Sequence, residues 1–543
     1  MNDEAQPAAL DWSVDGEPPK AILVWPYLVF HWAVQSIMPV MRERYGTRFL
    51  IAVPNDNMAD RYHAHLTDRD ELIRFPNFHE AADVSVAEDE IYDLARDNEA
   101  RYGVNYMRDI IQLDRRWFTK LSSMAPNSIF GEMEPPTLAR MFDAINRTFV
   151  WSEELFEQHQ IDLFLGWPLT FQDACCTYVA QKRDILVTYP YPAKLEDRVF
   201  WASGAFTASF QHNEAFERVT EVEPFDVESL ISPAVPVKLR HDKVSDLYTT
   251  RRIARDIATL IYKDLRRIAA DIRHRRKFWA SRPINLRRII TTKLRTWRFF
   301  HRYCRLCESD LDALARRPFV FYAFHQEPEF TVQGQAKDYN DQMAIVRQIA
   351  KSLPAGFNVV IKEHVTLGFR NLSYYQELTA FPNVLMAHPD IPGPKLVGRS
   401  HAVASLRGTV TLEAALLGKP ALVFVPGTEF SMLSNTRLVP SLAKLVECLA
   451  EIAKPVSAQM RKCYHDDGAR FRTAVKEMSF SAPPLYSTDG SLLPPETAAR
   501  AVDLLVRLNN LFRQRGGKPS RPRRRPSASG SPLGSAENRS GQL

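Results

Sequence analysis

Three polar stretches in the C-terminal half of the chain combine residue types that act on sugars and phosphates. The first is His325-Gln326-Glu327-Pro328-Glu329, which directly follows an apolar run. A histidine and carboxylates on a strand-to-helix loop can bind sugar hydroxyls or transfer protons. A helix N-cap cluster is the alternative, but it explains only residues 338–341. We therefore predict that His325, Glu327 and Glu329 belong to a functional site.

The second stretch, Lys362-Glu363-His364, follows another apolar run. Cationic side chains at the tip of a buried strand suit the negative charge of a nucleotide phosphate. A purely structural histidine is the alternative. We predict that Lys362 and His364 face an anionic ligand.

The third stretch runs from Arg407 through Gly408 and Thr409 to Glu413. Gly408 permits a tight turn into a helix, and Thr409 adds a hydroxyl near the helix N-terminus, where anions bind. Glu413 lies one turn further along, where it can accept hydrogen bonds from ribose hydroxyls. An ordinary glycine-capped turn is the alternative.

Short apolar runs alternate with helical patterns around these stretches. The predicted strands of the C-terminal half are 319–324, 358–361, 384–386, 401–405 and 421–425, and the predicted helices are 339–353, 372–378, 395–399 and 409–417. This alternation predicts a doubly wound parallel sheet, whose strands end along a common edge. The three polar stretches should therefore meet at that edge.

The N-terminal half gives the same kind of signal. Strands are predicted at 22–24, 49–53, 163–166 and 186–189, with helices at 91–116, 136–159 and 172–182. Strand ends carry Pro or Gly, as in Gly166-Trp167-Pro168. The expected fold class is therefore α/β, with two Rossmann-like doubly wound domains.

The net charge of +6 conceals a strong segregation. Residues 251–305 have a net charge of +15 and residues 513–543 a net charge of +7, which leaves −16 on the rest of the chain. Aromatic residues interleave the basic ones, and apolar residues recur every four positions from Ile253 to Leu265. A basic amphipathic helix of this kind binds anionic membrane surfaces, or else covers an acidic neighbour. No nucleic-acid-binding motif occurs, so no nucleic acid partner is expected.

Several other classes are disfavoured. Cys304 and Cys307 have the spacing of half a zinc site, but no second pair accompanies them, so no metal is expected. No GxGxxG fingerprint, GxxxxGK[ST] loop or GxSxG motif follows a predicted strand, which disfavours dinucleotide dehydrogenases, P-loop enzymes and α/β-hydrolases. The acidic first twenty residues and the polar interruptions within 21–40 disfavour a signal peptide and a membrane anchor. We expect a cytoplasmic location.

The order of the motifs resembles the C-terminal half of the capsule polysaccharide biosynthesis family. The resemblance covers about 319–430 and is carried by His325-Gln326-Glu327-Pro328-Glu329, Tyr339-Asn340-Asp341-Gln342, Lys362-Glu363-His364, Gly408-Thr409 with Glu413-Ala414, and Gly418-Lys419-Pro420. Members of this family are GT-B glycosyltransferase-like bacterial proteins. Some of them transfer 3-deoxy-manno-octulosonate from its CMP-activated form to a lipid acceptor.

The resemblance implies roles for individual residues. His364 would face the donor phosphate, Thr409 would bind phosphate, and Glu413 would lie near the nucleotide. Glu327 and Glu329 would belong to the acidic loop that lines the cleft. Transfer to an acceptor hydroxyl also needs a catalytic base, for which Glu327, Glu329 and Asp173 in the other half of the chain are the candidates. The remaining residues expected at the donor site are His325, Lys362, Arg407 and Gly408. The sequence departs from the family at Val365, where a proline is usual, and at Arg407, where a smaller residue is commoner.

We therefore expect a GT-B-like glycosyltransferase without a cofactor, using a CMP- or UDP-linked donor and a polysaccharide or lipid-linked acceptor. The basic segment 251–305 would bind anionic lipids of the inner leaflet, placing the protein on the inner face of the plasma membrane. The alternatives are a GT-B-fold epimerase, a polyol-phosphate transferase, and a non-catalytic polysaccharide assembly or export partner.

The expected organisation has six parts. They are a flexible N-terminus (1–20), an N-terminal Rossmann-like acceptor domain (21–248), a basic helical bridge (249–317), a C-terminal nucleotide-sugar-binding domain (318–480), a C-terminal helical segment (481–513) and a disordered basic tail (514–543).

Overall fold

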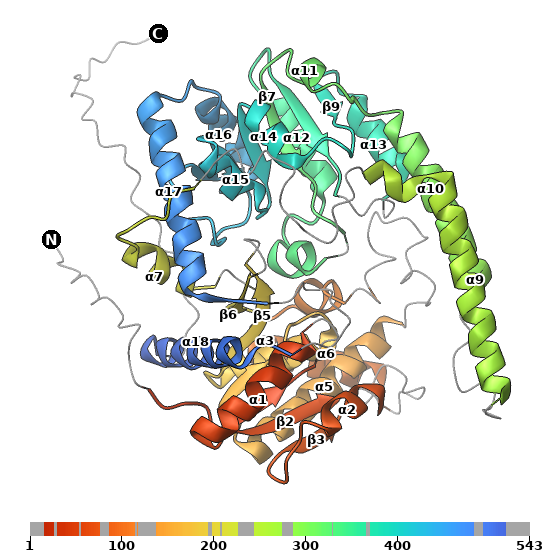
Figure 1. Ribbon diagram of the computed structural model, residues 1–543, viewed down its shortest axis with the longest axis vertical. Helices are drawn as coiled ribbons and strands as arrows, with labels where there is room; N and C mark the ends of the chain where they lie inside the picture. The colour runs from red at the N-terminus through yellow and green to blue at the C-terminus, as the bar shows by residue number, and fades with distance from the viewer. Residues whose placement is uncertain are drawn as a thin grey trace.

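The computed structural model describes residues 16–26, 30–53, 56–75, 86–114, 117, 137–193, 198–206, 209–225, 244–273, 286–327, 329–364, 370–482 and 492–516. These residues form two α/β units, which lie one above the other in Figure 1. Each unit is built on a largely or wholly parallel sheet covered by helices on both faces. The predicted fold class, two Rossmann-like doubly wound domains, is confirmed.

The N-terminal sheet has the strand order β13-β6-β5-β4-β1-β2-β3. Its strands are β1 (Ala21–Val24), β2 (Arg48–Val53), β3 (Glu71–Arg74), β4 (Leu163–Leu165), β5 (Leu186–Pro192), β6 (Arg198–Ala202) and β13 (Ser479–Ser481). Strands β1 to β5 run parallel to one another. Strand β6 pairs with β5 in antiparallel fashion, and β13 pairs with β6 in the same way. The chain order reverses between β1 and β4, which are neighbours in the sheet.

Both faces of this sheet are buried. Ile22 and Val24 of β1 pack into one core with α1 (His31–Tyr45) and α18 (Pro495–Gln514). Ala21 and Leu23 pack into a second core on the other face. The helices on that face are α3 (Glu88–Tyr102), α5 (Leu138–His159) and α6 (Phe171–Lys182). Burial on both faces explains why these strands read as continuous apolar runs.

The C-terminal sheet has the order β12-β11-β10-β7-β8-β9 and is parallel throughout. Its strands are β7 (Phe319–Ala323), β8 (Asn358–Lys362), β9 (Val384–Met386), β10 (Ala402–Ser405), β11 (Ala421–Val423) and β12 (Thr436–Leu438). The helices of this unit are η3 (Thr331–Gln335), α12 (Gln342–Ser352), α13 (Leu372–Thr379), α14 (Gly393–Arg399), α15 (Val410–Leu416), η4 (Leu442–Lys444), α16 (Leu445–Ile452) and α17 (Ala458–Glu477).

A pair of long basic helices lies along one side of the molecule (Figure 1). They are α9 (Thr250–Arg273), which follows the short helix η2 (Val244–Tyr248), and α10 (Leu286–Cys304), which precedes α11 (Leu311–Leu314). Phe300 and Tyr303 of α10 are buried in the core of the C-terminal unit. The C-terminal part of α10 is therefore anchored, while α9 extends beyond the two sheets.

The end of the described chain returns to the N-terminal unit. Strand β13 pairs with β6, and α18 packs against α1. Trp201 of β6 donates its indole N–H to the carbonyl of Ala501 at 2.8 Å. The N-terminal sheet is thus completed by residues from the far end of the sequence. The other short helices of the described residues are α2 (Asp56–His63), η1 (Tyr106–Ile111) and α7 (Gln211–Arg218).

Two features differ from the sequence prediction. The helix predicted over 91–116 is divided, because Gly103 adopts a left-handed conformation (φ 66°) that ends α3 before η1 begins. The strands β3, β6, β12 and β13 were not predicted. Strands β3, β12 and β13 are short and carry charged or polar residues, whereas β6 is apolar and buried from Val199 to Ala202 and was missed despite this signal. The tail predicted to be disordered lies almost entirely outside the described residues.

Candidate active site

The reversal of chain order in the C-terminal sheet lies between β7 and β10. From β7 the chain runs outward to β8 and β9, and it then crosses over to β10, β11 and β12. Helices at such a reversal leave on opposite faces of the sheet, which opens a crevice at the carboxyl ends of the strands. The loops that follow β7, β8 and β10 begin with Phe324, Glu363 and Leu406.

A cavity of about 350 Å³ lies at this edge. Its lining includes seven of the nine residues predicted for the site, namely His325, Glu329, Lys362, His364, Gly408, Thr409 and Glu413. They come from all three loops. The sheet therefore brings together residues that are far apart in the sequence.

His325 and Gly408 form the link between the loops of β7 and β10. A ring nitrogen of His325 (Nε2) lies 3.1 Å from the hydroxyl oxygen of Ser405, and that oxygen accepts the Gly408 N–H at 2.8 Å. A Cβ atom on Gly408 would lie 2.6 Å from the same hydroxyl, so a larger residue requires this contact to shift. Gly408 is thus needed for close packing.

Lys362 and Glu413 approach each other in the cavity. Desolvation lowers the pKa of Lys362, and the negative charges of Glu413 and Asp390 oppose this effect. Desolvation raises the pKa of Glu413 to about 7, against the influence of Lys362. Glu413 therefore holds its proton through mildly acidic pH, and near neutrality it exists in both forms.

His364 and Glu329 form a second pair at the cavity. Desolvation by the surrounding walls lowers the pKa of His364, although its ring keeps exposed surface, and the Glu329 carboxylate acts in the opposite direction. An anionic ligand would favour the protonated imidazole. The cavity thus offers two basic side chains, Lys362 and His364, whose protonation responds to what is bound.

A buried arginine outside the predicted motifs holds two of these loops in place. Arg370 is 2% exposed and donates to Glu363 at 2.5 Å and to the His325 carbonyl at 2.8 Å. It also pairs with Glu327 at 3.1 Å. Its guanidinium lies 4.8 Å from the centre of the Phe324 ring. Arg370 therefore connects the loop after β7 to the loop after β8.

Glu327 does not line the cavity. It is buried, pairs with Arg370 and accepts a hydrogen bond from the Gln342 side chain. Its position suits it to hold the loop rather than to take a proton from a substrate. Of the two carboxylates predicted as base, only Glu329 borders the cavity.

Arg407 also points away from the cavity. It is buried and forms an ion pair with Glu429. Its charge acts on Tyr189 of β5, so it lies near the N-terminal unit, and it is not among the residues that line the cavity. The prediction that Arg407 lies within the donor site is not reproduced by this geometry.

Asp173 has a structural role. Its carboxylate accepts the N–H groups of Leu169 and Thr170 at 3.1 and 3.0 Å and completes a capping box at the start of α6. The side chain is fully buried. The capping box commits this carboxylate to the helix start, away from the cavity.

The two units meet at the carboxyl ends of their sheets. Trp167, which follows β4, lies 5.9 Å from Phe330 between ring centres. Arg108 and Asp338 form an ion pair at 2.6 Å, and Lys337 pairs with Asp109. Gln112 donates to the carbonyl of Lys337 at 3.3 Å. The candidate site therefore lies on the side of the C-terminal unit that faces the N-terminal one.

The sequence predicts that no metal is bound and that phosphate binds near Thr409. Within the described residues, no group of three or more His, Cys, Asp or Glu side chains is arranged to hold a metal ion. The helix after Thr409, α15, has only seven residues, so its dipole adds little to anion binding. Lys362, His364 and Thr409, the residues predicted to face phosphate, all line the cavity.

Comparison with known proteins assigns no family. No family model and no curated protein matches the chain. Among solved structures, MnaA of S. aureus in complex with UDP aligns at 9% identity and a TM-score of 0.27, covering 83% of this chain and 91% of that one. The KpsC β-Kdo 2,4-transferase of Thermosulfurimonas dismutans aligns at 10% identity and 0.27, covering 56% and 79%. The spinosyn rhamnosyltransferase SpnG with thymidine diphosphate aligns at 13% identity and 0.22, covering 84% and 96%. These values are low, so function is inferred from the cavity itself.

Replacing Arg370 with methionine should destabilise the protein by about 3–5 kcal/mol, because Glu327 and Glu363 would be left buried without their cation. The control is Arg347→Met, which removes a surface ion pair to Glu377 and should cost less than about 1 kcal/mol. Urea unfolding of both variants measures the difference. Equal losses would show that Arg370 does not hold the loops.

Glu413→Gln should change how stability depends on pH. The unfolded carboxyl ionises near pH 4.5, whereas the folded one keeps its proton up to about pH 7, so wild-type stability falls as pH rises through this interval. The variant lacks this loss. Its free energy of unfolding, relative to that of the wild type at the same pH, should therefore increase with pH by no more than about 3 kcal/mol. Thermal unfolding from pH 4 to 8 tests this, with exposed Glu377→Gln as the control. A difference that does not vary with pH would contradict the assignment.

Proposed function

We propose that the protein is a GT-B-like glycosyltransferase of bacterial capsular or surface polysaccharide biosynthesis. It transfers a sugar from a CMP- or UDP-linked donor to a lipid-linked or glycan acceptor. One observation carries the proposal: Glu329, Lys362, His364 and Glu413 converge on one cavity at the strand-order reversal of the C-terminal sheet. Nucleotides bind at such reversals in open parallel sheets.

Each cavity residue has a role in this reaction. Lys362 and His364 bind the donor phosphate and stabilise the negative charge that grows as the sugar departs. Thr409 adds a hydroxyl donor, and Glu413 accepts hydrogen bonds from the ribose. Glu329 takes the proton of the acceptor hydroxyl, since it is the predicted base that lines the cavity.

The rival functions make different products from the same cavity. An epimerase would change the donor sugar without an acceptor, and a polyol-phosphate transferase would move phosphate with the alcohol. A non-catalytic assembly partner would release no nucleotide. Incubation with nucleotide sugars, with and without a glycan acceptor, followed by mass spectrometry of sugar and nucleotide, separates these cases.

The donor site predicts selective nucleotide binding. Purified protein should be stabilised by one of CMP, UDP, GDP or CDP, or by the corresponding sugar conjugates, by about 2.7 kcal/mol at 100 times the dissociation constant. His364→Ala should lose most of this stabilisation, because a phosphate-facing cation is removed. The control is His63→Ala, an exposed histidine on α2. Stabilisation by no nucleotide, or an equal loss in both variants, would refute the donor site.

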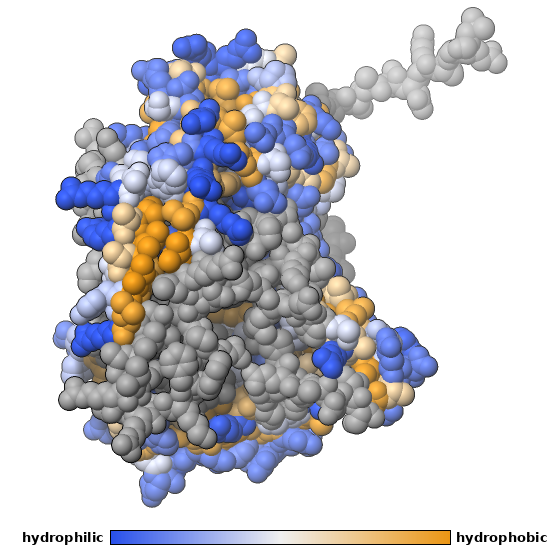
Figure 2. Space-filling model, turned by 90° about the vertical axis from the view of Figure 1, so that its right-hand side faces the viewer, coloured by the Kyte–Doolittle hydropathy of each residue, from blue (hydrophilic) through white to orange (hydrophobic). Residues whose placement is uncertain are grey.

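The helices α9 and α10 favour a membrane-bound acceptor. Arg255, Tyr262 and Arg266 share one face of α9, since they are spaced seven and four residues apart. Tyr262 is 63% exposed and neighbouring Leu265 is 61% exposed. Figure 2 looks onto this side of the molecule and shows an apolar strip beside hydrophilic residues. We propose that this face binds anionic lipids of the inner leaflet.

Several basic side chains of these helices are exposed, while others join the two helices. Asp256 pairs with Lys293 at 3.1 Å and with Arg252 at 3.5 Å, which joins α9 to α10. Arg255, Arg266 and Arg298 are exposed. Among the described residues, no helix is long and apolar enough to span a bilayer. A surface contact that buries Tyr262 and Leu265 at the headgroup level matches this composition.

The full chain should sediment with vesicles containing phosphatidylglycerol at low salt and dissociate as salt is raised, because each basic residue at the surface contributes about 1 kcal/mol. Arg255→Glu with Arg266→Glu should weaken binding more than tenfold. The matched control is Arg96→Glu with Arg347→Glu, which changes the charge equally elsewhere on the surface. Equally strong binding to neutral vesicles would contradict an electrostatic contact.

A further inference from the structure

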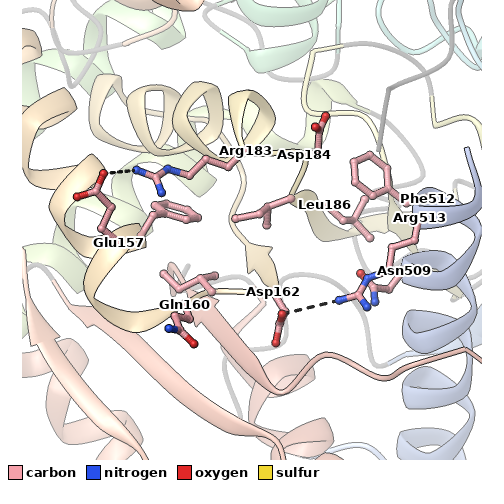
Figure 3. Close-up of a pocket in the computed structure, with 12 residues that line it drawn as sticks. Glu157, Gln160, Asp162, Arg183, Asp184, Leu186, Asn509, Phe512 and Arg513 are labelled. Carbon is pink, nitrogen blue, oxygen red and sulfur yellow. Dashed lines mark hydrogen bonds and ion pairs between the residues drawn. The ribbon is translucent and has the colours of Figure 1, made fainter. Parts of the chain in front are cut away.

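A second cavity lies at the amino ends of strands β4 and β5 in the N-terminal sheet. It has a volume of about 520 Å³ and is bordered by the residues that precede β4 and β5, together with α18 (Figure 3). The candidate active site belongs to the carboxyl edge of the other sheet. The two cavities share no lining residue. A ligand here would therefore be separate from the donor.

Asn509 of α18 is the unusual residue in this cavity. It is 1% exposed, and within the described structure neither its amide nitrogen nor its amide oxygen has a hydrogen-bond partner. A buried polar group left unpaired costs about 1–3 kcal/mol. Figure 3 shows the Asn509 side chain next to that of Arg513, on the side of the cavity facing Asp162. A ligand that offers an acceptor beside a donor would satisfy both amide atoms.

The Arg513 side chain lies next to this amide, and its two ion pairs are long. It is 3.8 Å from Asp162 and 3.9 Å from Glu17, both longer than a hydrogen bond. Asp162 is held firmly, since its Oδ2 accepts the N–H groups of Lys20 and Ala21 at 2.8 and 3.0 Å. Its other oxygen faces Arg513. Movement of Arg513 would expose Asn509 and one oxygen of Asp162 together.

Apolar side chains form part of the cavity wall. The buried side chains that border the cavity are Phe156, Ile161, Leu186 and Phe512. Gln160 and Asp184, which also border it, have φ angles of 47° and 54°, and they are the two non-glycine residues with positive φ in the described chain. Both residues lie at the end of a helix, α5 and α6 respectively, where a left-handed conformation is common. These features suit a flat ring with one polar edge.

The charges around the cavity disfavour a phosphate. Glu157, Asp162 and Asp184 oppose Arg183 and Arg513, which leaves one net negative charge. Arg183 is occupied by Glu153 and by Glu157, the latter at 3.0 Å. An uncharged ligand with hydroxyl groups is therefore preferred, because carboxylates accept hydrogen bonds from hydroxyls.

We propose that this cavity binds a nucleoside. The base would pair its adjacent donor and acceptor with the amide of Asn509, as asparagine does with the edge of adenine in DNA recognition. The base would pack against Leu186 and Phe512, and the ribose hydroxyls would donate to Asp162. The volume lies within the range of small-molecule sites. This inference does not depend on the proposed transferase activity.

The test uses the full chain, titrated with adenosine, cytidine, uridine and guanosine in a calorimeter. At least one nucleoside should bind with a dissociation constant below about 1 mM, and Asn509→Leu should weaken it about tenfold or more through the loss of two hydrogen bonds. His364→Ala, in the other cavity, should leave this affinity unchanged. Asn509→Leu should melt at or above the wild-type temperature, since it removes an unpaired buried amide.

Hydrogen–deuterium exchange of the wild-type chain locates the bound nucleoside without a variant. Protection is expected at 160–162 and 184–186, and no protection at 362–364 and 408–413. Absence of nucleoside binding at millimolar concentration would overturn the proposal. Binding that His364→Ala abolishes, or protection confined to the C-terminal cavity, would overturn it as well.

Discussion

The buried guanidinium of Arg370 determines the shape of the candidate active site. It contacts the His325 carbonyl, Glu327 and Glu363, and it lies against the Phe324 ring. A cation without water is tolerated only when its partners are close and well oriented. Because those partners belong to the ends of β7 and β8, their geometry fixes how far the two loops are apart. The remaining side chains of these loops are thereby directed into the cavity.

Carboxylates of the same type acquire different roles from their surroundings. Glu327 and Glu363 are buried beside Arg370 and keep the loops together. Glu329 and Glu413 border the cavity, and Glu413 has a pKa raised to about 7 by desolvation. Carboxylates that hold the loops together are thus separated from carboxylates that border the cavity.

The sequence predicts most of this arrangement, for identifiable physical reasons. Central strands such as β1 and β7 are apolar throughout because both faces are covered, so they stand out in the sequence. The common edge of a parallel sheet then places His325, Lys362 and Gly408 together. Side-chain direction is not available from such patterns. Glu327 and Arg407 turn away from the cavity because Arg370 and Glu429 attract them, and these partners lie outside the motifs.

The contacts that join the two units differ in kind from those that build the site. Arg108 and Asp338 are about half exposed, so their ion pair contributes little and breaks easily. Arg407 and Glu429 are buried, but both belong to the C-terminal unit. Separation of the units would break not only the exposed pair but also the Lys337–Asp109 pair, in which the Asp109 side chain is nearly buried, and the ring contact between Trp167 and Phe330. The partners of Arg370 all belong to the C-terminal unit, so the Arg370 cluster does not depend on these contacts.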